Sequence, residues 1–289
     1  MNSLVGACQN VVMNDSNLAD TVALIAKSNG QANHACRMRN HPNPLARFGR
    51  HVFSQTDEDG ITIEIIRRLG LRAGYFLEYG AGEGTQNNTL VLLALGWSGV
   101  WVDGTACGVE LPHGSRVHHE QRWVTRDNVA EIARDSLALC GANSFDVVSM
   151  DMDGNDYYFV EQLLGTGHRP DLFIVETVPL PPPIEFKIDY DPDFVWSAHE
   201  FQYVGASLTA YDRLFSKYGY TLVCCNTGSG ANAFFVLNTH AHEFRDVPSS
   251  ISEIYAEPAS DLLLPRSLHP PASKRLVAHL ATDSGPPGS

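Results

Sequence analysis

The feature that most constrains the fold is a hydrophobic run that ends in an acid and is followed by alternating glycines. The acid is Glu78, and Gly80, Gly82 and Gly84 follow it at every second position. Glycine accepts positive φ and lets the backbone pass close to a ligand. A helix-like segment comes next, and a second apolar run then ends at Asp103. This order predicts a strand, a glycine-rich turn, a helix and a parallel strand, which together form a nucleoside-binding unit.

The spacing distinguishes two cofactors. A dinucleotide fold uses G-x-G-x-x-G, whose third glycine would fall at Thr85, whereas this chain has G-x-G-x-G behind an acid. A pyrophosphate favours exposed amides without an acid nearby. S-adenosylmethionine (SAM) carries a sulfonium cation and an ammonium group, which tolerate Glu78 and Glu83. We therefore expect SAM, with the three glycines and Glu78 on its methionine side and Asp103 on its ribose. A plain β–α turn with a surface acid is the alternative.

Composition restricts the partners. The chain has 289 residues, 44% of them hydrophobic, enough for one large α/β domain with extended ends. A net charge of −13 argues against nucleic acid or an anionic membrane as a partner. No apolar stretch is long enough for a membrane span, and the start lacks the pattern of a signal peptide. Six scattered cysteines without a C-x-x-C pair are typical of reduced thiols, so we expect a cytoplasmic protein.

Alternating apolar and helical segments predict an α/β, Rossmann-like fold. We expect a seven-stranded, mostly parallel sheet with an antiparallel final hairpin and helices on both faces. The short glycine-rich connection 226–230 predicts the hairpin. The expected strands are 75–79, 99–103, 120–125, 145–150, 171–175, 220–225 and 233–237. The expected helices are 18–27, 61–69 (capped by Ser54 or Thr56 and ended by Gly70), 86–95, 127–139, 157–164 and 207–218.

The ends of the chain and one insertion depart from this pattern. We assign residues 1–49 to an N-terminal cap or dimer arm, and an arm would make the protein a homodimer. Residues 50–240 are the predicted SAM-binding domain, and 241–289 a partly flexible C-terminal extension. A proline-rich insertion at 178–204 leaves the fifth strand at the edge where open α/β sheets bind ligands. We expect a substrate lid there, and a decorative loop is the alternative.

Acids are concentrated after the fourth and fifth strands. Asp151, Asp153 and Asp156 follow the fourth strand, and Glu176 ends the fifth. Parallel strands present their carboxyl ends at one edge, so these groups should lie together beside the cofactor methyl group. They could accept a proton from a substrate, hold Mg²⁺ or attract a cationic substrate. A turn and helix cap is the structural alternative, strongest for Asp156. We assign Asp151, Asp153 and Glu176 to the reaction centre, with Asp151 also touching the cofactor.

The remaining candidate residues match no specific sequence motif. Thr125 and Asp127, after the third strand, are expected to border the adenine. His118 and His119 lack zinc-ligand spacing, and Ser149 lacks the G-x-S-x-G elbow of hydrolases. His199, inside the insertion, could serve as a base, although a lone loop histidine is more often simply solvated.

Four stretches together resemble class I SAM-dependent methyltransferases and, within them, the FkbM-like group. They are 54–60, 78–84, 150–157, and 205–207 with the closing hairpin. The stretch 150–157 is also similar to the acid-rich segment of catechol-type O-methyltransferases, where such an Asp helps to hold Mg²⁺. Those enzymes have an Asp-Asn pair after the fifth strand, where this chain has Glu176-Thr177. The resemblance implies O-methylation of a small molecule, as in small-molecule biosynthesis.

The sequence thus predicts an enzyme that moves a methyl group from SAM to a hydroxyl, or less readily an amine, of a small-molecule acceptor. Two alternatives keep the same cofactor site. One is an enzyme that cyclises or cleaves SAM, because fold and reaction are separate questions. The other is a non-catalytic SAM-binding module.

Overall fold

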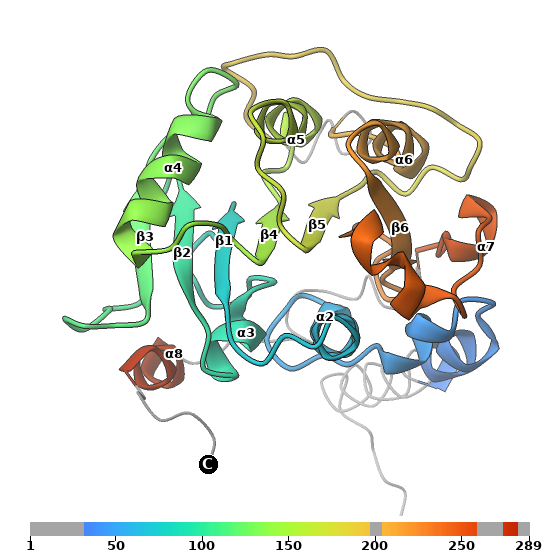
Figure 1. Ribbon diagram of the computed structural model, residues 1–289, viewed down its shortest axis with the longest axis horizontal. Helices are drawn as coiled ribbons and strands as arrows, with labels where there is room; N and C mark the ends of the chain where they lie inside the picture. Colours follow the sequence, from blue (N-terminus) through green and yellow to red (C-terminus); the bar gives the residue numbers. More distant parts are fainter. Residues whose placement is uncertain (1–31, 197–203, 259–273, 283–289) are drawn as a thin grey trace, which may run out of the picture.

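A seven-stranded sheet forms the centre of the computed structural model, which describes residues 32–196, 204–258 and 274–282 (Figure 1). The strand order is β3-β2-β1-β4-β5-β7-β6. Strands β1 to β5 pair in parallel, and β7 pairs antiparallel with both β5 and β6. The predicted fold class is therefore confirmed. The strands are Tyr75–Tyr79, Ser98–Asp103, Val117–Gln121, Val147–Met150, Leu172–Glu176, Tyr220–Cys225 and Asn232–Leu237, in order β1 to β7.

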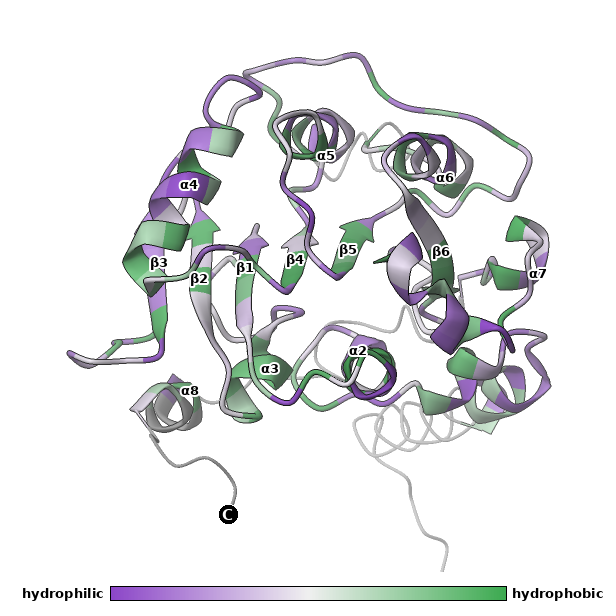
Figure 2. Cartoon of the chain, in the orientation of Figure 1, coloured by the Kyte–Doolittle hydropathy of each residue, from purple (hydrophilic) through white to green (hydrophobic). Residues whose placement is uncertain are grey.

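Helices cover both faces of the sheet, as predicted (Figure 1). On one face lie α2 (Glu58–Arg68), α3 (Leu90–Ala94) and α8 (Lys274–Thr282). On the other lie α4 (Val129–Cys140), α5 (Asp156–Gly165) and α6 (Leu208–Lys217). Each face has its own hydrophobic cluster, and the central strand β5 is mostly hydrophobic (Figure 2). The smaller elements are the 3₁₀ helices η1 (Pro44–Phe48) and η3 (Asn238–Phe244) and the helix α7 (Ile251–Ile254).

The strand order reverses between β1 and β4, and this is where an open α/β sheet leaves a crevice at its carboxyl ends. The two strands pair over four residues, from Phe76 opposite Val147 to Tyr79 opposite Met150. Because helices cover both faces, these strands are apolar almost throughout. Their chain ends therefore carry the polar chemistry.

The third strand was predicted too late in the sequence. It spans Val117–Gln121 rather than 120–125. The Asn128 side chain donates to the carbonyl of Trp123 and accepts from the amide of Thr125, which folds this segment into a turn. Local hydrogen bonds of this kind compete with the strand ladder.

Two helix starts also differ from the prediction. Asp57 is the N-cap position of α2, so the proposed caps Ser54 and Thr56 are wrong. The helix α3 begins at Leu90 rather than 86, because the amides of Asn88 and Thr89 donate to a side chain from β1.

The described parts of both ends pack on the sheet. Leu45 and Ala46 of η1 are fully buried, and Asn43 donates to the carbonyl of Val223 in β6 at 2.7 Å. Val277 and Ala281 of α8 are fully buried too. The predicted helix at 18–27 lies outside the described residues. Within the described ranges, no helix has both the length and the apolarity needed to cross a bilayer.

Gly80→Ala tests the close approach of the β1 and β4 turns. A Cβ atom at Gly80 would lie 1.6 Å from the carbonyl oxygen of Asp151, at a φ of +83°. We expect the substitution to lower the free energy of unfolding by about 3 kcal/mol or more in urea denaturation. The matched control is Gly70→Ala, with a φ of +71° and open space around the added Cβ. It should cost about 1 kcal/mol, and equal losses would contradict the steric account.

Candidate functional site

Four chain turns meet at the carboxyl edge of the sheet around the reversal of strand order. The turn after β1 donates from the amide of Gly80 to the carbonyl of Val102 in β2 at 2.9 Å. The turn after β4 donates from the amide of Asp151 to the carbonyl of Tyr79 at 3.1 Å. These backbone bonds bring the glycine run and the acids after β4 to one place, as the sequence predicted. Asp103 and Glu176 end the flanking strands β2 and β5.

All three glycines of the β1 turn have positive φ, at 83°, 54° and 75° for Gly80, Gly82 and Gly84. A side chain at Gly80 would strike the carbonyl of Asp151, and one at Gly84 would meet the ring of Trp101 at 3.0 Å. Gly82 has open space beside its Cα. The turn is therefore packed on two sides and open at its middle glycine.

Asp103 links the turns after β1 and β2. One carboxylate oxygen accepts from the amide of Gly82 at 2.8 Å, and the other accepts from the amide and hydroxyl of Thr105 at 2.7 Å. A carboxylate offers about four lone-pair sites. Asp103 is partly exposed, so it can shape the turn and still accept from a ligand hydroxyl.

Glu78 is fully engaged inside the protein. Its buried carboxylate accepts from the Asn87 amide group, the backbone of Asn88, and the backbone and hydroxyl of Thr89. Burial raises its pKa, and these donors oppose the shift. Glu78 therefore holds the segment that follows the glycine turn in place from inside the protein, and its expected position beside a cofactor stays a prediction.

Asp156 shapes the turn after β4. Its buried carboxylate accepts from the backbone amides of Met152 at 2.6 Å and Gly154 at 2.8 Å, and burial raises its pKa to about 6. The structural alternative is thus correct for Asp156, as a turn rather than a helix cap. Within the same turn Asp153 has a φ of +59°. This left-handed conformation is uncommon for a residue other than glycine and occurs often at functional sites.

Asp151, Asp153 and Glu176 form one cluster, with carboxylate oxygens all within 4.8 Å of one another. Asp151 and Glu176 are half-buried, and Asp153 is exposed. Burial, followed by the neighbouring acids, raises the pKa of Asp151 well above its usual range. Burial, followed by the charge of Asp151, does the same for Glu176. The two groups therefore hold protons as a pair rather than as independent acids.

A second set of acids, Asp57, Glu58 and Asp59, is buried at the start of α2. Asp59 accepts three backbone amides from residues 52–54, while Asp57 accepts the amides of Thr227 and Gly228 after β6. Glu58 is held by Thr56, Asn226 and Asn232. In the sequence these acids look like an ordinary first helical turn. Nothing local signals that Asp57 and Glu58 also have partners about 170 residues away.

The described part of the insertion after β5 crosses the site. Asn155 bonds to the backbone of Asp191 in both directions, at 2.6 and 3.2 Å. The amide of Arg126 donates to the Tyr190 hydroxyl, and the space beside Gly154 is filled by the ring of Phe194. These bonds attach the insertion to the turns after β3 and β4, and its role as a lid stays a prediction. The proposed base His199 lies outside the described residues.

Thr125 and Asp127 lie in the turn before α4, where Thr125 is half-buried and Asp127 exposed. The ring of Trp123 lies against Gly104, next to Asp103, with 54% of its surface exposed. Its indole also donates to the carbonyl of Pro192 in the insertion, at 3.4 Å. Sequence reasoning missed Trp123, and the one available signal was an aromatic residue beside the predicted adenine segment.

The three clustered carboxylates are donors of the type that Mg²⁺ prefers. The next residue after β5 adds nothing to such a site, because the Thr177 hydroxyl donates to the carbonyl of Ala231 at 3.2 Å. The cluster therefore suits a hard cation in its donor chemistry, without the amide partner of the catechol-type enzymes.

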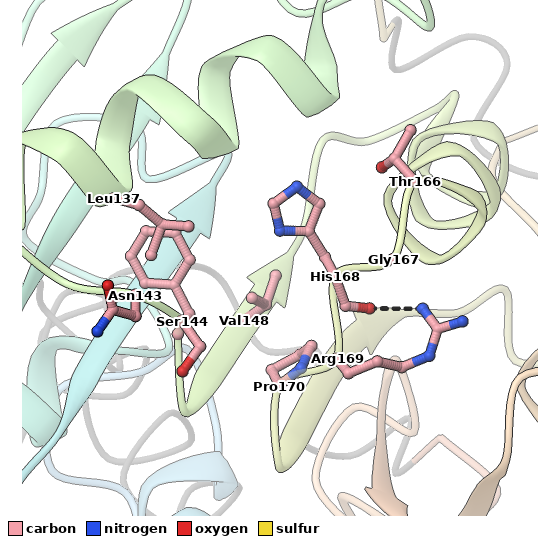
Figure 3. Close-up of a pocket in the computed structure, with 10 residues that line it drawn as sticks. Leu137, Asn143, Ser144, Val148, Thr166, Gly167, His168, Arg169 and Pro170 are labelled. Carbon is pink, nitrogen blue, oxygen red and sulfur yellow. Dashed lines mark hydrogen bonds between the residues drawn. The ribbon is translucent and has the colours of Figure 1, made fainter.

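A cavity of about 310 Å³ lies elsewhere, between α4 and the segment that follows α5 (Figure 3). Leu137, Phe145 and Val148 form its apolar wall, and the ring of His168 points into it. Most of its lining residues, 143–145 and 166–170, come directly before β4 and β5, which places it towards the amino edge of the sheet. It contains none of the candidate residues.

Comparison with known proteins gives limited similarity. No family model and no curated protein matches the chain. Among solved structures, a Lactococcus lactis protein with the provisional description of a hemolysin is 12% identical over 61% of this chain and 84% of its own (TM-score 0.39). The SAH-bound methyltransferase PaMTH1 of Podospora anserina is 12% identical over 82% and 99% (0.36). An O-methyltransferase family protein of Burkholderia thailandensis is 11% identical over 71% and 68% (0.35). Identities and TM-scores this low carry no functional inference.

Glu176→Gln tests the like-charge cluster. A carboxyl group whose pKa is raised by folding favours the folded state at low pH, and this contribution is lost as pH rises towards the folded pKa. Removing the charge should therefore raise the melting temperature relative to wild type at pH 8, and much less at pH 5. Glu161→Gln, in an exposed pair with Arg126, is the control and should not gain stability. A loss of stability for Glu176→Gln at both pH values would contradict the cluster's electrostatics.

Proposed function

We propose that the chain is a SAM-dependent methyltransferase that transfers the methyl group to a hydroxyl of a small molecule. The observation that carries this proposal is the pair Asp151 and Glu176 at the reversal of strand order. Neither carboxylate accepts an N–H or O–H donor from the described protein outside the acid cluster. The other acids around the crevice do, as for Glu78 and Asp156.

This contrast distinguishes acids with a structural role from acids that are available to a ligand. Polar groups inside proteins are almost always hydrogen-bonded, so buried acids with several donors have structural roles. A half-buried pair with raised pKa and no donors is suited to a ligand instead. We therefore assign Asp151 and Glu176 to the reacting group and Glu78 and Asp156 to the scaffold.

The proposed cofactor position follows from the turns. Asp103 would accept from the ribose hydroxyls, with Trp123 and the segment of Thr125 and Asp127 towards the adenine. The glycine turn would hold the methionine part, with Gly82 as its open position. The sulfonium would then lie towards Asp151, whose negative charge attracts a cation. NAD⁺ fits less well, because its pyrophosphate would meet this acidic edge.

The proposed chemistry has two parts. The crevice aligns the acceptor oxygen, the methyl carbon and the sulfur, which supplies most of the rate gain. The acceptor proton passes to the Asp151–Glu176 pair, whose pKa values are raised by burial and by the neighbouring acids, which makes the pair a stronger base than an exposed carboxylate. An amine acceptor would use the same geometry. If SAM were instead cyclised or cleaved, the product would be a SAM fragment without a methylated acceptor.

A divalent cation would be held by Asp151, Asp153 and Glu176, where it would acidify a bound hydroxyl. The acceptor is proposed to be small and not a polyanion, because the chain carries a net charge of −13.

Calorimetric titration with SAM and with NAD⁺ tests the cofactor. We expect SAM to bind and NAD⁺ to bind at least tenfold more weakly, because the acids repel a pyrophosphate. No SAM binding, or tighter NAD⁺ binding, would contradict the proposal.

Asp103→Ala tests the nucleoside position. Loss of the ribose contacts should weaken SAM binding by about 10- to 100-fold, since hydrogen bonds to a charged group are worth about 1.5–3 kcal/mol. The control is Thr105→Ala, which removes a donor to Asp103 but keeps the carboxylate, and it should change the affinity less than about threefold. An unchanged affinity in Asp103→Ala would mean that the ribose binds elsewhere.

A further inference from the structure

A tyrosine on α6 has a hydroxyl without a partner. Tyr211 is fully buried, and its hydroxyl has no hydrogen-bond partner among the described residues. Two other fully buried tyrosines have partners for their hydroxyls. Tyr79 donates to the carbonyl of Val129 at 2.7 Å, and Tyr220 donates to that of Pro170 at 2.8 Å. Leaving a buried hydroxyl unpaired costs free energy, so such a group in a native protein calls for an explanation.

The position of Tyr211 gives that explanation. Its ring lies 5.7 Å from the ring of Tyr157, which directly follows Asp156 in the turn after β4. Its helix also begins beside the end of β5, because Ser207, the N-cap residue of α6, pairs with Val178, two residues after Glu176. The unpartnered donor therefore adjoins the acid cluster whose carboxylates also lack donors.

We propose that Tyr211 is an acceptor-binding residue, whose hydroxyl donates to the acceptor oxygen opposite the Asp151–Glu176 pair. This inference rests on the proposed methyl transfer. The oxygen to be methylated would accept from Tyr211 while its own proton points to the carboxylates. In the transfer, an oxygen–carbon bond forms and the sulfur–carbon bond breaks. The sulfur keeps the bonding electrons and becomes neutral, and the acceptor proton passes to the carboxylate pair.

The same arrangement favours acceptors that carry no negative charge near the reacting hydroxyl. Tyr211 supplies one donor, and the acids supply acceptors and negative charge. A neutral hydroxyl compound, such as an alcohol, phenol or sugar, satisfies both sets. An acceptor with a carboxylate or phosphate next to the reacting hydroxyl would be repelled. We therefore infer a substrate that is uncharged near its reacting oxygen.

The insertion after β5 is bonded to the helix that carries Tyr211. Ser207, the N-cap residue of α6, bonds through its backbone amide and hydroxyl to Phe186 of the insertion in both directions. The amide of Val178, where the lid leaves β5, donates to the carbonyl of Ala206. The lid base and the start of α6 are thus one hydrogen-bonded unit.

The first test compares Tyr211→Phe with Tyr220→Phe in thermal unfolding of the ligand-free protein. Tyr211→Phe removes an unpaired donor, so its melting temperature should equal or exceed that of wild type. Tyr220→Phe breaks a buried bond and should melt about 2–4 °C lower. A fall in Tyr211→Phe as large as in Tyr220→Phe would overturn the proposal, because the hydroxyl would then have a partner in the free protein.

The second test measures transfer of the SAM methyl group to catechol, methyl α-glucoside and 3-hydroxybenzoate. For a probe that wild type methylates, Tyr211→Phe should lower kcat/KM about 10- to 100-fold and leave SAM affinity unchanged. Tyr220→Phe should stay within about threefold of wild type. The charged benzoate should be a poorer substrate than catechol. Equal kcat/KM in Tyr211→Phe and wild type overturns the proposal.

The outcomes distinguish a failure of the proposed function from a failure of the role assigned to Tyr211. Failure of wild type to bind SAM contradicts the proposed function itself. SAM binding with no methylation of any neutral hydroxyl probe contradicts the acceptor class inferred from Tyr211. SAM binding and methyl transfer that do not depend on Tyr211 contradict only its role.

Discussion

The contact between the turns after β1 and β4 is the constraint on which the rest of the site depends. Gly80 lies so close to the carbonyl of Asp151 that no side chain fits between them. This approach occurs where the strand order reverses, so it joins the glycine turn to the acid turn. With any larger residue at position 80 the two turns would separate. A cofactor held by one could then not be presented to the carboxylates of the other.

The acids at the carboxyl edge of the sheet fall into two groups, according to whether they accept hydrogen bonds from the protein. Glu78, Asp156 and the acids at the start of α2 each accept several amides or hydroxyls, and they fix the turns around the crevice. Asp151 and Glu176 lack such donors and are forced to share protons. Several buried carboxylates therefore stabilise the turns, and one pair is left available for a ligand. Tyr211 is the complementary donor that the fold leaves unused.

Much of this arrangement could be predicted from the sequence, because it depends on local patterns. Apolar runs that end in Glu78, Asp103 and Glu176 gave the strands, and the parallel order then placed their ends together. What could not be predicted depends on distant partners. The role of Asp57 requires the turn after β6, and the end of β3 depends on the side chain of Asn128. The free hydroxyl of Tyr211 is visible only after every neighbour has been placed.

Proton release on cofactor binding tests the central claim most directly. If the sulfonium lies beside Asp151 and Glu176, its positive charge must lower their raised pKa values and expel a proton. S-adenosylhomocysteine has the same shape but a neutral sulfur. Calorimetric titrations at pH 7, in two buffers with different ionisation enthalpies, should therefore show protons released by SAM and not by S-adenosylhomocysteine. Equal proton exchange for the two ligands would contradict the placement of the methyl group at the acid pair.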